Sequence, residues 1–201
     1  MPNHCSNLLT VTGAASELAT FCNYALQKDA DDSISSCPDL HYLYPIPEGV
    51  TKADDPGILS TEEYNWRKDH WGTKWNTYSN VGLGMVRSDI SNRLIGIQCS
   101  FETAWAPPTG AIRVGSVKFP NLNFTLEYAE AGVMFRGVAF YKNGKEYFDH
   151  IEDNLTDKEW ESPDYTKMDD KNQIRHVEDM RRDINPDTIE LSDTTEEVLS
   201  R

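Results

Sequence analysis

The first 149 residues contain short runs in which apolar residues have the spacing of strands or of helices. Residues 5–12 are rich in leucine, valine and threonine and are followed by Gly13, which predicts a strand. Between residues 18 and 26 apolar side chains recur three and four positions apart, which predicts a helix beginning near Ser16. The polar, acidic residues 28–38 predict a loop.

A longer insertion, at about residues 45–93, separates this first part from the rest of the domain. Residues 40–44 precede two prolines, which cannot donate to a sheet ladder, and they predict a short strand. Residues 48–60 contain glycine, proline and aspartate and predict a loop. Two further strands are predicted at residues 76–81 and 94–101.

Capping residues locate two more helices. Ser60 can cap a helix that runs through Trp66 to about Trp71, and Gly72 is placed to end it. Residues 107–119 begin with two prolines, which are tolerated in a first helical turn, and predict a second helix.

The last part of the domain has the pattern of antiparallel strands. Residues 123–128 and 133–141 alternate apolar with polar side chains and predict a hairpin, and a turn at residues 143–144 leads into residues 145–148. The order of elements predicts an α+β domain over residues 1–149, with an antiparallel sheet and helices packed on one face.

The pattern weakens after residue 150. Residues 167–183 could form one helix with a thin apolar stripe, which the following Asn185-Pro186 would end. Residues 150–201 carry 16 acidic and 7 basic side chains, a net charge of −9, against 17 and 12 in the rest of the chain. We predict an acidic C-terminal extension that is partly helical and whose last dozen residues are mobile.

The formal net charge of −14 disfavours binding to nucleic acids or to anionic membranes. The acidic extension is either a solubilising surface or a mimic of DNA, in which carboxylates imitate the phosphates. No run approaches the 18 or so apolar residues of a membrane span, and the N-terminus lacks the basic and apolar regions of a signal peptide. We therefore expect a soluble, intracellular protein.

Signatures of metal binding and of catalysis are weak. Cys37-x-x-x-His41 lacks a second ligand pair and His4-Cys5 stands by itself, so we predict no metal site. The five histidines lie in unrelated contexts, and no nucleophile elbow, phosphate-binding loop or dinucleotide fingerprint is found. We predict a protein that is not an enzyme and needs no cofactor. The widely spaced cysteines predict reduced thiols.

Four of the five tryptophans fall in two short tracts, residues 66–76 and 101–108. Tryptophan is common both in cores and in contact surfaces, so two interpretations stay open. In the first, Trp71, Trp75 and Trp105 pack beneath the insertion and extend the core. In the second, the tracts form a surface that grips a partner or a flat ligand. The candidate binding residues are Trp66, His70, Trp71, Lys74, Trp75, Trp105 and Arg113.

Four ordered motifs carry a family resemblance: Met1-Pro-Asn-x-Cys5-Ser-Asn-x-Leu-x-Val-Thr-Gly13, Trp71-Gly-Thr-Lys-Trp-Asn76, Phe101-x-Thr-Ala-Trp-x-Pro-Pro108 and Tyr128-x-Glu130-x-Gly132-x-x-Phe135-x-Gly137. With them, residues 1–148 resemble the YubB-like family of phages and conjugative plasmids, although His4 stands where that family often has tryptophan. The resemblance implies a ferredoxin-like domain, a mobile-element origin and the cytoplasm of a bacterial host. It supplies no catalytic residues, because the family has no assigned activity.

Small acidic proteins of phages and plasmids often antagonise host defence. We therefore expect stoichiometric inhibition of a host defence protein through the tryptophan surface, the acidic extension or both. One alternative is a nucleotide-signal sponge, with a pocket of three tryptophans (residues 71, 75 and 105), Lys74 and Arg113. Another is a single-stranded nucleic-acid module that stacks bases on Phe124, Tyr128 and Phe140. The sequence predicts no oligomeric state.

Overall fold

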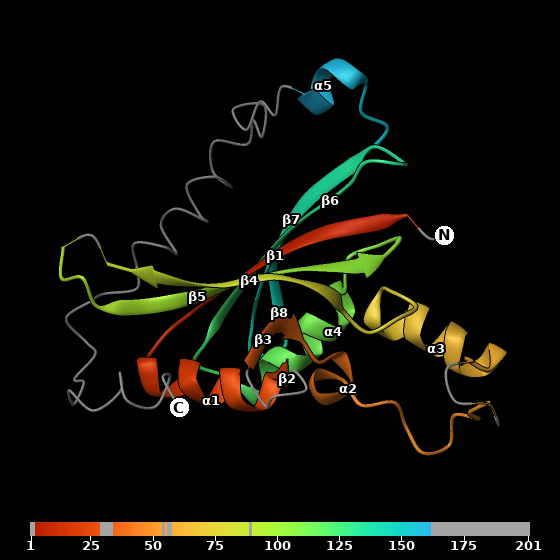
Figure 1. Ribbon diagram of the computed structural model, residues 1–201, viewed down its shortest axis with the longest axis horizontal. Coiled ribbons are helices and arrows are strands. Elements are labelled where there is room, and N and C mark those ends of the chain that lie inside the picture. Colours follow the sequence, from red (N-terminus) through yellow and green to blue (C-terminus); the bar gives the residue numbers. More distant parts are fainter. Residues whose placement is uncertain (1–2, 29–33, 54, 56–57, 89, 162–201) are drawn as a thin grey trace.

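The computed structural model describes residues 3–28, 34–53, 55, 58–88 and 90–161. Their centre is a six-stranded antiparallel sheet with the strand order β4-β5-β1-β6-β7-β8 (Figure 1). Its strands are β1 (His4–Thr12), β4 (Tyr78–Arg87), β5 (Leu94–Ala104), β6 (Asn123–Glu130), β7 (Phe135–Lys142) and β8 (Lys145–Glu152). A second sheet pairs β2 (Leu26–Lys28) with β3 (Ile34–Pro38). The predicted helix at residues 167–183 and the end of the acidic extension lie outside the described residues.

Helices cover one face of the large sheet. Figure 1 shows α1, α2 and α4 together below the strands, with α3 beside them at the end of the sheet where the chain begins. The helices are α1 (Ala15–Ala25), α2 (Leu40–Leu43), α3 (Thr61–Trp71), α4 (Thr109–Gly115), the 3₁₀ helix η1 (Ser116–Lys118) and α5 (Asp157–Glu161). The predicted α+β class, with an antiparallel sheet and helices on one face, is confirmed.

The strands alternate between side chains that face the helices and side chains that do not. In β1, Leu9 and Val11 are fully buried, whereas Thr10 between them is only half-buried. The buried face of α1 contributes Leu18 and Phe21 to the same core. Burial of one such side chain contributes about 1.5–3 kcal/mol, so this layer holds the helices on the sheet.

The helix predicted from Ser60 is present as α3. The Ser60 hydroxyl accepts a hydrogen bond from the backbone amide of Glu63 at 3.0 Å, which satisfies one of the free amides of the first turn. Gly72 ends the helix in the left-handed conformation, with φ of 91°. The other predicted helix is confirmed as α4 and η1, and the predicted hairpin is confirmed as β6 and β7.

Two predictions between residues 28 and 44 were wrong. Residues 40–43 of this segment form the short helix α2 rather than a strand: Leu40 and Leu43 are both buried, and the Asp39 carboxylate caps the helix by accepting the amide of His41 at 2.9 Å. The expected loop at residues 28–38 contains β3, which pairs with β2. Both elements are short, so their tertiary contacts outweigh local propensity.

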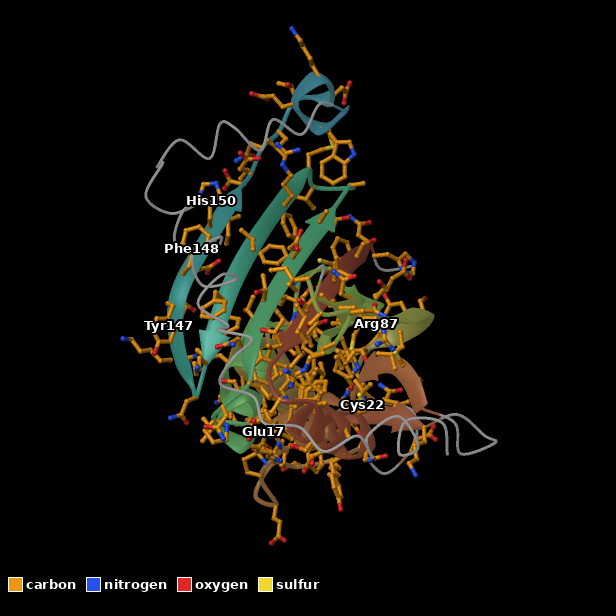
Figure 2. The ribbon with its side chains drawn as sticks, turned by 90° about the vertical axis from the view of Figure 1, so that its left-hand side faces the viewer. Glu17, Cys22, Arg87, Tyr147, Phe148 and His150 are labelled. Atoms are coloured by element: carbon orange, nitrogen blue, oxygen red, sulfur yellow. The ribbon has the colours of Figure 1, made fainter. Side chains whose placement is uncertain are left out.

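The far edge of the sheet is formed by β8. Figure 2 shows Tyr147, Phe148 and His150 along this strand, away from the helix α1 to which Cys22 belongs. Beyond β8 the chain returns to the β6–β7 turn, where the amide of Leu155 donates to the carbonyl oxygen of Met134 at 3.0 Å. Among the described helices, none has the length and apolar character needed to cross a membrane.

Candidate functional site

Trp71, the last residue of α3, is fully buried. Its indole Nε1 donates to the carbonyl oxygen of Tyr44 at 2.7 Å. The guanidinium of Arg67 lies 4.9 Å from the centre of the Trp71 ring, and the His41 ring meets it edge-on at 4.7 Å. Trp71 therefore packs in the core, which corrects its prediction as a residue that contacts a partner or ligand.

Trp66 and His70 stack on one another along α3, with ring centroids 4.5 Å apart and planes 7° from parallel. His70 Nδ1 lies 2.8 Å from the carbonyl oxygen of Trp66, and the Tyr44 ring meets Trp66 edge-on at 5.2 Å. Both rings are half-buried. They brace α3 against the segment that follows α2.

The two tryptophan tracts are held together by a side-chain hydrogen bond and by close backbone packing just after the second tract. The hydroxyl of Thr73 donates to the carbonyl oxygen of Ala104 at 3.0 Å. At Gly110, a Cβ atom would stand 2.1 Å from the carbonyl oxygen of His70, so only glycine allows this approach. The end of α3 and the start of α4 are thereby held together.

A second set of bonds holds the loop between α3 and β4. Asn76 Oδ1 accepts the amide of Leu40 at 2.9 Å, and Asn76 Nδ2 donates to the Asp39 carboxylate at 3.1 Å. The buried Thr77 hydroxyl donates to the carbonyl oxygen of Pro38 at 2.6 Å. With the Thr73 bond on the other side, this loop is fixed at both ends and its middle faces solvent.

Lys74 and Trp75 occupy that middle. Trp75 is 40% exposed, although the interpretation as core required it to be covered. The Lys74 ammonium lies over the Trp75 ring, 4.5 Å from its centroid. The Trp75 ring also meets the Tyr78 ring edge-on, at 6.4 Å between centroids. Trp75 is therefore a surface residue on an anchored loop.

Trp105, in the second tract, is 45% exposed and has a φ of 73°. Its amide donates to the carbonyl oxygen of Asn3 at 3.0 Å, which places it beside the start of β1. A bulky residue in the left-handed region is uncommon, and such strain costs on the order of 1–3 kcal/mol. The interpretation of Trp105 as a core residue is not supported.

Four polar side chains complete this corner of the molecule. His4 Nδ1 lies 3.2 Å from Glu102 Oε2 and 3.1 Å from the Tyr78 hydroxyl oxygen, and the Ser79 hydroxyl donates to Glu102 Oε2 at 2.7 Å. Burial, followed by the negative charge of Glu102, raises the pKa of Tyr78, which keeps it a neutral hydrogen-bonding group.

We call this surface the tryptophan platform; its members are His4, Lys74, Trp75, Tyr78, Glu102 and Trp105. Sequence reasoning missed three of them as site residues: His4, Tyr78 and Glu102. They come together through pairing of β4 with β5, which sets Tyr78 opposite Glu102, and of β1 with β5. The regular alternation along each strand was the available signal, but it does not reveal which strands are neighbours.

Arg113 was predicted as a binding residue, but it lies on α4 and, among the described residues, makes no hydrogen bond, ion pair or cation–π contact with a member of the platform. Burial raises the pKa of Tyr141, and the guanidinium of Arg113 offsets part of this rise. Because Trp71 is fully buried in the core, it is not available to line the pocket that the sponge alternative required.

The rings proposed to stack nucleic-acid bases are also covered. Phe124 and Tyr128 are 1% and 4% exposed, because they lie on the face of β6 that points to the helices. Phe140 is 5% exposed. These rings offer no open face to a base, and that corrects the sequence interpretation.

The fourth motif builds the β6–β7 turn. The buried Glu130 carboxylate accepts the amides of Gly132 and Val133, at 2.8 and 2.6 Å. A Cβ atom at Gly137 would stand 2.5 Å from the Tyr128 ring, so the ring packs directly on the backbone. These motif residues therefore have structural roles.

Thiols and metal-ligating groups give no second site. Burial raises the pKa of Cys5 to about 12 and of Cys22 to about 11, which keeps both thiols protonated. Burial likewise raises the pKa of Cys99. Within the described ranges, no group of three or more histidine, cysteine, aspartate or glutamate side chains is placed to hold a metal ion.

Comparison with known proteins identifies a family that matches this chain. The family described as "Ferredoxin-like domain in Api92-like protein" matches residues 71–178, more than half of the chain. The crystal structure of the protein api92 from Yersinia pseudotuberculosis is similar, with 10% sequence identity and a TM-score of 0.44, over 78% of this chain and 100% of that chain. No curated protein matches the sequence significantly.

Proposed function

Because the chain belongs to the Api92-like family and carries its ferredoxin-like domain, we propose that it is a non-enzymatic protein that binds another protein stoichiometrically through the tryptophan platform. The exposure of Trp75 and Trp105 on anchored backbone supports this most. Tryptophan is enriched among residues that dominate binding energy, and backbone strain such as that at Trp105 gathers at functional sites.

The proposal extends to the biological setting. The resemblance carried by the four motifs favours a phage or plasmid protein, acting in the cytoplasm of a bacterial host against a defence protein. The acidic extension, residues 150–201 with a net charge of −9, would present carboxylates to a DNA-binding groove on the same partner. In this proposal the platform supplies specificity and the extension adds long-range attraction.

Affinity capture from host lysate tests the proposal, with the full chain as bait and mass spectrometry to identify what is retained. The double variant W75A/W105A should lose a partner that the wild type retains, and the purified pair should form a complex of fixed stoichiometry in light scattering. Tyr147→Ala is the matched control: its ring is 44% exposed and carries Lys145 at 4.5 Å, on the far strand β8. Equal retention by the wild type and the double variant would contradict the proposal.

A further inference from the structure

We propose that the tryptophan platform receives a cationic side chain, an arginine or lysine on a basic segment of the partner protein. This inference rests on the proposed function and adds the chemistry of the group that is bound. Three observations carry it: a cation already held on one platform ring, a platform carboxylate with an open oxygen, and the negative charge of the whole chain.

The first observation is the position of Lys74. Its ammonium lies 4.5 Å from the centroid of the Trp75 ring, so this ring holds a cation within the folded protein. Trp75 and Trp105 each keep close to half of their surface exposed. The exposed part of the Trp75 ring can take a second cation in the same way, and Trp105 offers another exposed ring on the platform.

The second observation concerns Glu102. Its hydrogen bond from Ser79 and its contact with His4 are both made by Oε2, and within the described part of the chain Oε1 has no hydrogen-bond partner. The side chain is 29% exposed. A carboxylate can accept several hydrogen bonds, and a guanidinium on the rings would have Oε1 as its acceptor.

The third observation is charge complementarity. The chain carries a net charge of −14, which attracts a basic partner over long range and repels an acidic one. Lys74 is a permanently basic group on the platform itself, and its ammonium would compete with an incoming cation for the Trp75 ring. Removing the charge of Lys74 should therefore strengthen the binding of a cation. If the platform instead binds a phosphate or a carboxylate, the same change should weaken binding.

The test uses the full-length protein with ¹⁵N-labelled tryptophan and two probes: the peptide acetyl-Gly-Ser-Arg-Ser-Gly-amide and its twin with neutral citrulline. Titration should shift the indole resonances of Trp75 and Trp105 and leave that of the buried Trp71 unchanged. The arginine peptide should bind about three- to tenfold more tightly than the citrulline peptide, the range expected for an exposed cation–π contact with a surface ion pair.

Two variants with the same change of charge separate local from global attraction. Glu102→Gln should remove most of the preference for arginine, while Glu48→Gln, in the exposed loop after α2, should leave it intact. Lys74→Gln should tighten binding of the arginine peptide about two- to threefold.

Equal binding of the two peptides, an equal effect of Glu102→Gln and Glu48→Gln, or weaker binding by Lys74→Gln would each overturn the inference. If W75A/W105A loses the captured partner while Glu102→Gln retains it fully, the platform binds by apolar contact and the proposed function survives without this inference. If neither variant affects capture, both proposals fail.

Discussion

The hydroxyl of Thr73 donates to the carbonyl oxygen of Ala104 at 3.0 Å, and this buried bond joins the loop of Trp75 to the strand end that precedes Trp105. The two exposed tryptophans therefore sit on backbone segments with a fixed relation to each other. A preorganised surface loses less conformational entropy on binding than one assembled from free loops. The bond is thus a structural basis for treating the platform as one site.

Replacement of Trp71 by alanine should destabilise the protein by about 3–5 kcal/mol, because it empties a fully buried site and removes the donor to Tyr44. Trp75→Ala is the matched control and should change the free energy of unfolding by less than about 1 kcal/mol. Urea denaturation followed by circular dichroism measures both. Similar losses in the two variants would show that the assignment of core and surface is wrong.

At position 105 the alanine variant should be less stable than the glycine variant, the reverse of the usual order of stability. Both substitutions remove the same ring, but the φ of 73° penalises alanine and not glycine, so Trp105→Gly should be more stable than Trp105→Ala by about 1 kcal/mol. Trp75 has no positive φ, and there the alanine variant should be at least as stable as the glycine variant. Melting curves of the four variants measure these differences. A higher melting temperature for Trp105→Ala than for Trp105→Gly would show that the backbone at position 105 is not strained.

Gly110→Ala should disrupt the junction of the two tryptophan tracts. The added Cβ would stand 2.1 Å from the carbonyl oxygen of His70, and a backbone atom cannot move aside as a flexible side chain can. We expect a loss of about 2–4 kcal/mol, at or above the usual cost of overpacking. Gly49→Ala, where nothing lies within 4 Å, should stay within about 1 kcal/mol of the wild type in the same denaturation assay.

Stability should fall as the pH rises above 9. The pKa of Cys5 rises from 9.0 to about 12 and that of Cys22 to about 11 in the folded state, both through burial. Above pH 9 the unfolded chain loses these protons while the folded chain keeps them, so the free energy of unfolding decreases by up to about 1.4 kcal/mol per pH unit for each thiol. Below pH 9 this contribution is fully present.

Denaturation curves between pH 7.5 and 10.5 check this expectation. Cys22→Ala should reduce the slope between pH 9 and 10.5, because one of the shifted thiols is then absent. At pH 8 the wild-type thiols should resist iodoacetamide until denaturant is added. A stability that is flat up to pH 10.5, or rapid alkylation of Cys22 in the folded protein, would contradict the assigned burial.

The parts of the fold that sequence predicted well have local signals. The Ser60 hydroxyl and the left-handed Gly72 mark the two ends of α3 without help from the rest of the chain. The hairpin of β6 and β7 follows from regular alternation around a turn. By contrast, α2 has only four residues, and its helical form depends on the Asp39 cap and on burial of two leucines.

The candidate site was only partly predictable for a different reason. Trp71, Trp75 and Trp105 belong to the same residue type in similar tracts, and nothing local separates the buried one from the exposed two. Exposure is decided by bonds such as that of Asn76 to Leu40, between residues 36 positions apart. The place of Glu102 beside His4 likewise depends on strand neighbours that are distant in sequence.

The central position of β1 also determines when the sheet can form. Within the described residues it pairs with β5 (Leu94–Ala104) and β6 (Asn123–Glu130), so β1 gains its neighbours only after more than 80 further residues have been synthesised. Until then the apolar side of β1 stays uncovered, and its pairing requires closure of loops of more than 80 residues, which slows folding. Nascent chains stalled before β6 should therefore depend on chaperones, and synthesis beyond it should release them.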